Sequence, residues 1–144
     1  MEKDDYIIKQ ISVFSENKPG RLAAIAKALQ DEKINIFAFS IAEAKGFGVV
    51  RLLVDRPEPA LKKLADIGFM VSFTDVIAVR MKDEPGGLFD IAKILGESDI
   101  NIEYSYAYSG KEAAVLILRV DRIREAIDKL MANGADLLRE DMFH

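Results

Sequence analysis

The apolar positions of the chain alternate between two spacings, and each change of spacing marks the border of a predicted element. Residues 6–15 are rich in β-branched residues, which is typical of a strand. After Pro19-Gly20, apolar residues recur at helical spacing, so one face of a helix is apolar. Pro57 and Gly68 then delimit a second helix. The pattern predicts strand, helix, strand, strand, helix and strand over residues 6–15, 22–29, 34–42, 49–55, 57–68 and 69–74.

This order of elements occurs twice, because the sequence repeats itself at an offset of 66 residues, the spacing from Pro19 to Pro85. The offset also places Ile34-Asn35-Ile36 on Ile100-Asn101-Ile102. The fold class is therefore α+β, with two ferredoxin-like βαββαβ repeats that each have an antiparallel sheet with helices on one face.

The two repeats follow each other without a linker. We assign residues 1–74 to the first repeat and residues 75–144 to the second, so that Thr74 and Asp75 form the whole junction. With so short a junction, we expect the two antiparallel sheets to lie side by side.

Composition removes several classes of function. The chain of 144 residues has no cysteine, and its only histidine is His144, so thiol chemistry is excluded and no catalytic histidine is expected. The 20 basic residues are scattered among 24 acidic ones, which argues against nucleic acid and anionic membranes as partners. The longest uncharged apolar run, residues 34–42, is too short to span a bilayer. We expect a cytoplasmic protein with no cofactor and no metal.

Candidate chemistry lies at two corners, residues 17–22 and 83–88, where a strand leads into a helix through Pro-Gly. Pro sets φ for the first helical turn and Gly allows close approach of the backbone. The free N–H groups at the start of a helix favour an anion such as a carboxylate. The side chains of Asn35 and Asn101, in otherwise apolar strands, can accept hydrogen bonds from an ammonium group and would be costly to bury without a partner.

The simpler interpretation of the corners is structural: Asn17 and Asp83 are then plain helix caps. The corners also differ in charge. Lys18 and Arg21 make the first corner positive, so we expect it to bind a carboxylate more readily. Asp83 at the second corner suits an ammonium group.

The x-x-P-G-x-L corner and the I-N-I opening of the next strand, present in both halves, resemble the ACT domain, an amino-acid-sensing module of many biosynthetic enzymes. The stretch SENKPGRL followed by KINI is similar to the serine-binding regulatory domain of phosphoglycerate dehydrogenase. The resemblance implies that a corner residue (Asn17 or Asp83) and a strand residue (Asn35 or Asn101) of neighbouring domains hold an amino acid across their interface. Ser15 stands where that family has a histidine, so serine itself is not implied.

We therefore expect a stand-alone tandem ACT protein, a non-catalytic sensor that acts through an oligomer change or through a partner such as a biosynthetic enzyme or ligase. The residues expected to bind the amino acid are Ser15, Asn17, Lys18, Pro19, Gly20, Arg21, Leu22, Asn35 and Ile36, and Asp83, Glu84, Pro85, Gly86, Gly87, Leu88, Asn101 and Ile102.

Three alternatives stay open. Residues 45–50, KGFGVV, resemble a strand signature of RNA-recognition motifs, but the second aromatic residue is absent at Val49 and the chain is acidic. An enzyme is disfavoured because acids such as Asp55 and Asp121 lack a histidine or cysteine partner, and we expect these two to cap helices.

The third alternative is a ligand-free scaffold or regulatory subunit that acts through protein–protein contacts. Alternating stripes of large side chains, Phe37, Phe39 and Ile41 in one copy and Tyr104, Tyr106 and Tyr108 in the other, suit an open sheet face covered by a second chain. We therefore expect a homodimer.

Overall fold

The computed structural model describes residues 3–109 and 113–143, so His144 lies outside the described part of the chain. Contacts divide the chain into two compact units. Below, the first unit is Lys9–Thr74, and the second unit is Asp75–Met142 together with the N-terminal segment up to Ile8. Residues 1–74 and 75–144 remain our proposed limits of the two sequence repeats.

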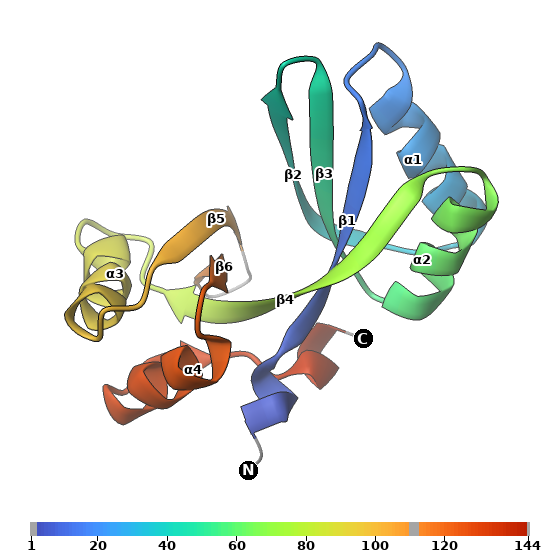
Figure 1. Ribbon diagram of the computed structural model, residues 1–144. Coiled ribbons are helices and arrows are strands. Elements are labelled where there is room, and N and C mark those ends of the chain that lie inside the picture. Colours follow the sequence, from blue (N-terminus) through green and yellow to red (C-terminus); the bar gives the residue numbers. More distant parts are fainter. Residues whose placement is uncertain (1–2, 110–112, 144) are drawn as a thin grey trace. The chain divides into compact units, whose positions relative to one another are not determined.

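The first unit contains β1 (Ile8–Glu16), α1 (Arg21–Asp31), β2 (Ile36–Ala44), β3 (Phe47–Val54), α2 (Pro57–Asp66) and the beginning of β4 (Met70–Met81). Its strands have the order β2-β3-β1-β4. Both helices lie against one face of this sheet (Figure 1). There they enclose a core whose fully buried members include Ile11, Ile25, Leu29, Leu52 and Leu64.

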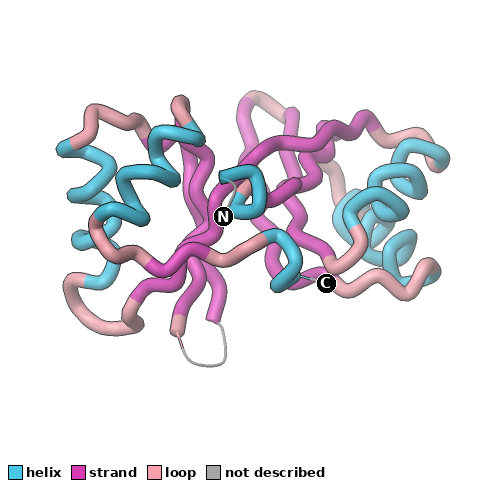
Figure 2. The backbone as a smooth tube through the Cα atoms, turned by 90° about the horizontal axis from the view of Figure 1, so that it is seen from below, coloured by secondary structure: helices cyan, strands magenta, loops and turns pink. Residues whose placement is uncertain are grey.

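The second unit contains the rest of β4, α3 (Gly87–Glu97), β5 (Ile102–Ser109), β6 (Ala114–Val120), α4 (Ile123–Ala132) and β7 (Asp136–Leu137). Its strand order is β5-β6-β4-β7. Short 3-10 helices lie near the two chain ends, at Lys3–Tyr6 and Glu140–Phe143 (Figure 2). The core again lies between sheet and helices, with Ile77, Leu95, Leu118, Ile127 and Leu130 fully buried.

The predicted α+β fold of two ferredoxin-like repeats is confirmed, including the helices on one sheet face. One boundary differs, because the closing strand predicted at residues 69–74 does not end there. It continues as β4 (Met70–Met81), which also supplies the first strand of the second repeat. No turn separates the two repeats, because a single strand passes from one repeat into the next. The side-by-side arrangement of the two sheets stays a prediction.

The aromatic stripe of β2 is interrupted by a shift of register between Ile36 and Ala38, at Phe37. Beyond this β-bulge, Phe39 lies opposite Leu52 and Ile41 opposite Val50. Because directly opposite residues share a sheet face, these two side chains are on the helix side, although both are exposed. The prediction of one regular stripe at 37, 39 and 41 is therefore wrong.

The tyrosine stripe of β5 lies on the other side of its own sheet. Tyr106 is opposite Ile117, and Tyr108 is opposite Val115, on the face that points away from α3 and α4.

None of the helices in the described part of the chain is long and apolar enough to cross a bilayer.

Candidate functional site

The first corner is a tight turn that precedes its helix. The Arg21 N–H donates to the Lys18 carbonyl oxygen at 3.2 Å, so Pro19 and Gly20 occupy the two central positions. Gly20 has φ +89° and ψ −11°, the conformation that glycine provides in a type II turn. Because α1 begins only at Arg21, Pro19 fixes the turn and not the first helical turn that we predicted for it.

The second corner repeats this geometry. The Gly87 N–H donates to the Glu84 carbonyl oxygen at 3.1 Å, and Gly86 has φ +94°. Here the position after the turn must also be glycine, because a Cβ on Gly87 would fall on the Lys82 carbonyl oxygen. The first unit has Arg21 at the same position, so the second corner has the tighter backbone.

These turns change the set of free donors. The N–H groups of Arg21 and Gly87, both predicted to bind a carboxylate, are used within the turns. Among the described residues, the N–H groups of Gly20, Leu22, Gly86 and Leu88 have no recorded backbone partner. Both helices that follow these corners, α1 and α3, are described, and neither has a hydrogen bond from a side-chain cap. The alternative that Asn17 and Asp83 are helix caps is therefore wrong.

Asn35 and Asn101 lie at the other end of each unit. Both are exposed and stand immediately before their strands, so the argument from burial inside a strand does not apply. The Asn35 N–H donates to Asp55 Oδ1 at 3.1 Å, and the Asp55 N–H donates back to the Asn35 carbonyl oxygen at 3.1 Å. Asn101 and Asp121 repeat both hydrogen bonds, at 3.2 and 3.3 Å. The asparagine side chains take no part in these hydrogen bonds, which use the asparagine backbone.

The predicted role of Asp55 and Asp121 as helix caps is therefore wrong. The helices α2 and α4 are preceded by Arg56 and Arg122 as N-cap residues, and these described helix starts have no side-chain cap. Both aspartates hold the start of the neighbouring strand instead. No sequence pattern of a single copy distinguishes these two uses of an aspartate at a strand end.

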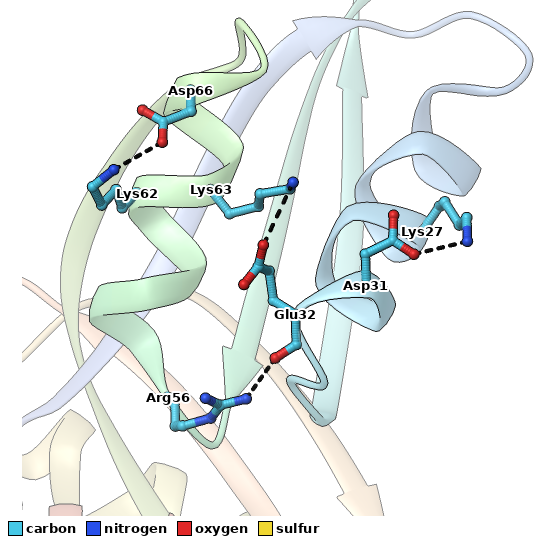
Figure 3. Close-up of polar contacts among 7 residues, drawn as sticks. All are labelled: Lys27, Asp31, Glu32, Arg56, Lys62, Lys63 and Asp66. Carbon is cyan, nitrogen blue, oxygen red and sulfur yellow. Dashed lines mark hydrogen bonds and ion pairs between the residues drawn. The ribbon is translucent and has the colours of Figure 1, made fainter.

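Arg56 is a structural residue that the sequence analysis missed. Its guanidinium donates to the carbonyl oxygens of Glu32 at 2.7 Å and Lys33 at 2.8 Å, which connects the end of α1 to the start of α2 (Figure 3). Arg122 reaches the Asp99 carbonyl oxygen in the same way. The signal was present, since the tripeptide Val-Asp-Arg occurs in both copies, at residues 54–56 and 120–122.

Within one unit, the corner and the strand asparagine are far apart. The α1 helix has 11 residues and separates Asn17 from Asn35. At ~1.5 Å per residue, such a helix is about 16 Å long. No single unit can therefore place both predicted groups on one amino acid.

The second unit has an open cavity of about 700 Å³ at its corner. It is lined by the end of β4 and the residues after it (Arg80, Met81, Lys82, Asp83), the first turns of α3 (Gly87, Asp90, Ile91, Ile94), the connection from α4 to β7 (Asn133, Gly134, Ala135), the first residue of β7 (Asp136) and Ala113. Two predicted site residues, Asp83 and Gly87, are among them. The other lining residues come from segments that the sequence analysis did not associate with the corner.

Charges of both signs line this cavity. Arg80 forms an ion pair with Asp136 at 3.1 Å, and Lys82 lies 4.0 Å from Glu84, just outside the cavity lining. Within the described part of the chain, the side chains of Asp83 and Asp90 make no recorded hydrogen bond or ion pair. The cavity can therefore offer free carboxylates to a cationic group.

Smaller cavities lie beside the two strand asparagines. One of about 520 Å³ is lined by Asn101, Asp121 and Arg122 among others. Another of about 440 Å³ is lined by Asn35, Ile36 and the end of α1. Thus the asparagines do border space for a ligand, although at the opposite end of the unit from the corner.

The first corner is less cationic than its sequence suggests. Lys18 Nζ lies 2.6 Å from Glu16 Oε2, and the hydrogen bond and charge of Lys18 lower the pKa of the Glu16 carboxyl group. The Asn17 N–H donates to the Gly46 carbonyl oxygen at 2.9 Å, which joins the corner to the β2–β3 hairpin. Lys18 is therefore already paired within the chain.

The two units have the same order of elements, strand, helix, strand, strand, helix and strand, which is the order of a pair of ferredoxin-like domains. The chain belongs to the ACT domain pair family, whose model matches residues 6–143. ACT domains are regulatory ligand-binding domains. The prediction of a regulatory class of protein, which the resemblance implied, is therefore confirmed.

Solved structures agree with this assignment. The chain is similar to a protein from Bacteroides thetaiotaomicron at 34% identity, with a TM-score of 0.90 and coverage of 94% of both chains. The regulatory subunit of aspartate kinase from Thermus thermophilus shares the fold at 15% identity, with a TM-score of 0.64 and coverage of 89% of this chain and 94% of that chain. The corresponding subunit from Thermus flavus, also at 15% identity, has a TM-score of 0.57 and coverage of 88% and 94%. A comparison with curated proteins gave no match.

Proposed function

We propose that this ACT domain pair is a non-catalytic sensor that binds a free amino acid. The observation that supports the proposal best is the cavity of about 700 Å³ at the second corner, which has charges of both signs and an apolar wall. A zwitterion needs both kinds of charge within a few ångströms. Cavities of this size lie within the usual range for small-molecule sites.

Each part of an amino acid has a complementary group there. Lys82, which lines the cavity before the start of α3, suits the carboxylate. Asp83 and Asp90 suit the ammonium group. The remaining wall is apolar and includes Met81, Ile91 and Ile94, which suits the aliphatic part of a side chain.

We further propose that a strand asparagine completes a site at an ACT–ACT interface. Asn35 and Asn101 lie too far from the corner of their own unit, so the asparagine must belong to a different ACT unit, in this chain or in a second copy. The second possibility would make a homodimer part of the site. Light scattering tests this part, since a strictly monomeric mass with and without ligand would contradict the homodimer.

The regulatory output follows from differential affinity. A ligand shifts a protein between two states only as far as it binds one state more tightly. We propose that the signal passes to an oligomer change or to a partner such as a biosynthetic enzyme or ligase. Separate regulatory subunits with this fold exist, as the Thermus thermophilus structure illustrates.

A thermal-shift screen against the twenty amino acids tests the sensor. A ligand present at 100 times its Kd stabilises the folded state by about 2.7 kcal/mol, enough for a clear rise in Tm. Ala135→Phe, which places a ring in the cavity, should remove this rise. Ala132→Phe is the matched control, because it adds the same ring to an exposed position three residues away. If no amino acid shifts the Tm of the wild type, the proposal is wrong and the ligand-free scaffold becomes the better explanation.

A further inference from the structure

The charged residues that line the cavity at the second corner are not repeated in the first unit. At the offset of 66 residues, four of its charged residues correspond to uncharged or oppositely charged ones. Arg80, Lys82, Asp90 and Asp136 correspond to Phe14, Glu16, Ala24 and Met70. The two repeats therefore share a backbone and differ in the chemistry of this region.

The space itself also depends on residues of the second repeat. Ala135 lines the cavity and packs against the core of the second unit, at the position where the larger Phe69 packs against the core of the first unit. Gly87 likewise corresponds to Arg21. Smaller residues thus stand in the second repeat at positions where the first has large ones.

The charges that line the cavity do not balance. Among the described residues that line it, there are three carboxylates (Asp83, Asp90 and Asp136) and two cations (Arg80 and Lys82). Arg80 and Asp136 neutralise each other at 3.1 Å. This leaves Lys82 with two aspartates, and Glu84 adds a further negative charge 4.0 Å from Lys82.

We infer that the amino acid bound in this cavity carries a positively charged side chain. The inference rests on the proposed function and names the ligand class of the same site. The ligand carboxylate replaces Glu84, which lies 4.0 Å away, as the partner of Lys82, and the α-ammonium group and side-chain cation of the ligand pair with Asp83 and Asp90. A neutral amino acid leaves one of these carboxylates without a partner, and the side chain of an acidic one adds a further negative charge.

The size of the preference follows from exposure. Asp83 and Asp90 are exposed, so the dielectric constant of water applies to their interactions. Two unit charges ~4 Å apart then interact by about 1 kcal/mol, which corresponds to roughly a fivefold change in Kd. The preference should weaken at high salt because exposed charges are screened.

Calorimetric titration with L-lysine, L-norleucine and L-glutamate tests the inference, because norleucine has the same carbon chain as lysine without the terminal ammonium group. We expect lysine to bind about fivefold more tightly than norleucine at low salt, and glutamate to bind most weakly. Asp83→Asn and Asp90→Asn should each reduce the ratio of lysine to norleucine affinity. Asp66→Asn is the control, because it removes the same charge on α2 of the first unit, away from the cavity.

The outcomes separate this inference from the proposed function. If norleucine or glutamate binds as tightly as lysine, the sensor stands and its cationic specificity is wrong. If Asp83→Asn and Asp90→Asn leave the lysine preference unchanged while Ala135→Phe leaves lysine binding intact, the ligand does not occupy this cavity. If none of the twenty amino acids binds, the proposed function itself fails.

Discussion

Gly87 offers the sharpest test of the corner geometry. It is the first residue of α3, directly after the turn that Gly86 completes with its left-handed φ of +94°. A Cβ at Gly87 would fall on the Lys82 carbonyl oxygen and would lie 3.1 Å from the carbonyl carbon. Both are backbone atoms, so no side-chain rotation can relieve the contact.

The cost of Gly87→Ala can be estimated from two opposing effects. Overpacking a tight site costs roughly 1–3 kcal/mol, because the surrounding backbone has to move. Replacing glycine by alanine in a helix recovers about 0.5–1 kcal/mol of conformational entropy. We therefore expect Gly87→Ala to lower the free energy of unfolding of the second unit by about 1–2 kcal/mol.

Gly96 provides a matched control in the same helix. A Cβ at Gly96 has open space around it, and the residue lies in the last turns of α3. Gly96→Ala should raise the free energy of unfolding by about 0.5–1 kcal/mol. The two alanine substitutions thus differ only in the space that receives the methyl group.

Urea denaturation followed by circular dichroism measures both variants. The chain has two compact units, so each transition is fitted separately wherever two are resolved. If Gly87→Ala is as stable as the wild type or stabilised like Gly96→Ala, the close approach of Lys82 to the corner is not as described. Retained lysine binding in Gly87→Ala would also contradict a role of the corner in shaping the cavity.

Three further predictions concern other parts of the chain. Asp55→Ala should lower the free energy of unfolding by about 1 kcal/mol, because the Asn35 N–H loses its hydrogen bond to the Asp55 side chain. Asn35→Ala keeps this backbone N–H and should change the free energy of unfolding by less than ~0.5 kcal/mol. Urea denaturation measures both variants. Burial raises the pKa of Tyr108, and Arg80 partly opposes the shift. The unfolded chain therefore loses this proton first as the pH rises above ~10, so stability falls there, and Tyr108→Phe should flatten this alkaline decrease in Tm. Ile127→Ala, at a fully buried position, should cost about 2–5 kcal/mol by the same urea assay, and a loss below ~1 kcal/mol would contradict the described core.

The sequence was sufficient for the fold because its signals are local and occur twice. Apolar spacing, Pro57 and Gly68 each specify their own element, and the second copy provides an independent check. The position of Pro19 was harder to interpret, since a Pro-Gly pair fits both a first helical turn and a type II turn. Only the hydrogen bond of Arg21 to Lys18 distinguishes the two.

The cavity could not be predicted from either copy alone. Arg80, Asp90 and Asp136 lie on three different elements, and only the folded unit brings them to the border of one cavity. Comparing the two copies would have given a hint, because Ala135 replaces a large aromatic residue, Phe69. The argument from the burial of Asn35 failed because β2 begins one residue later, at Ile36, which leaves Asn35 exposed before the strand.

Positions that match between the two repeats and positions that differ have separate roles, which explains how a duplicated backbone can have a specific site in one repeat. Positions that match in the two copies, such as Pro85-Gly86 and Asp121-Arg122, have backbone tasks, since they form the turn and hold the strand starts. Positions that differ, such as Ala135 and Asp90, line the cavity. A substitution at the first kind weakens a unit whether or not ligand is present, whereas one at an exposed differing position such as Asp90 changes what binds at little cost in stability. The specificity of the pair is therefore free to change in one unit while both units keep their fold.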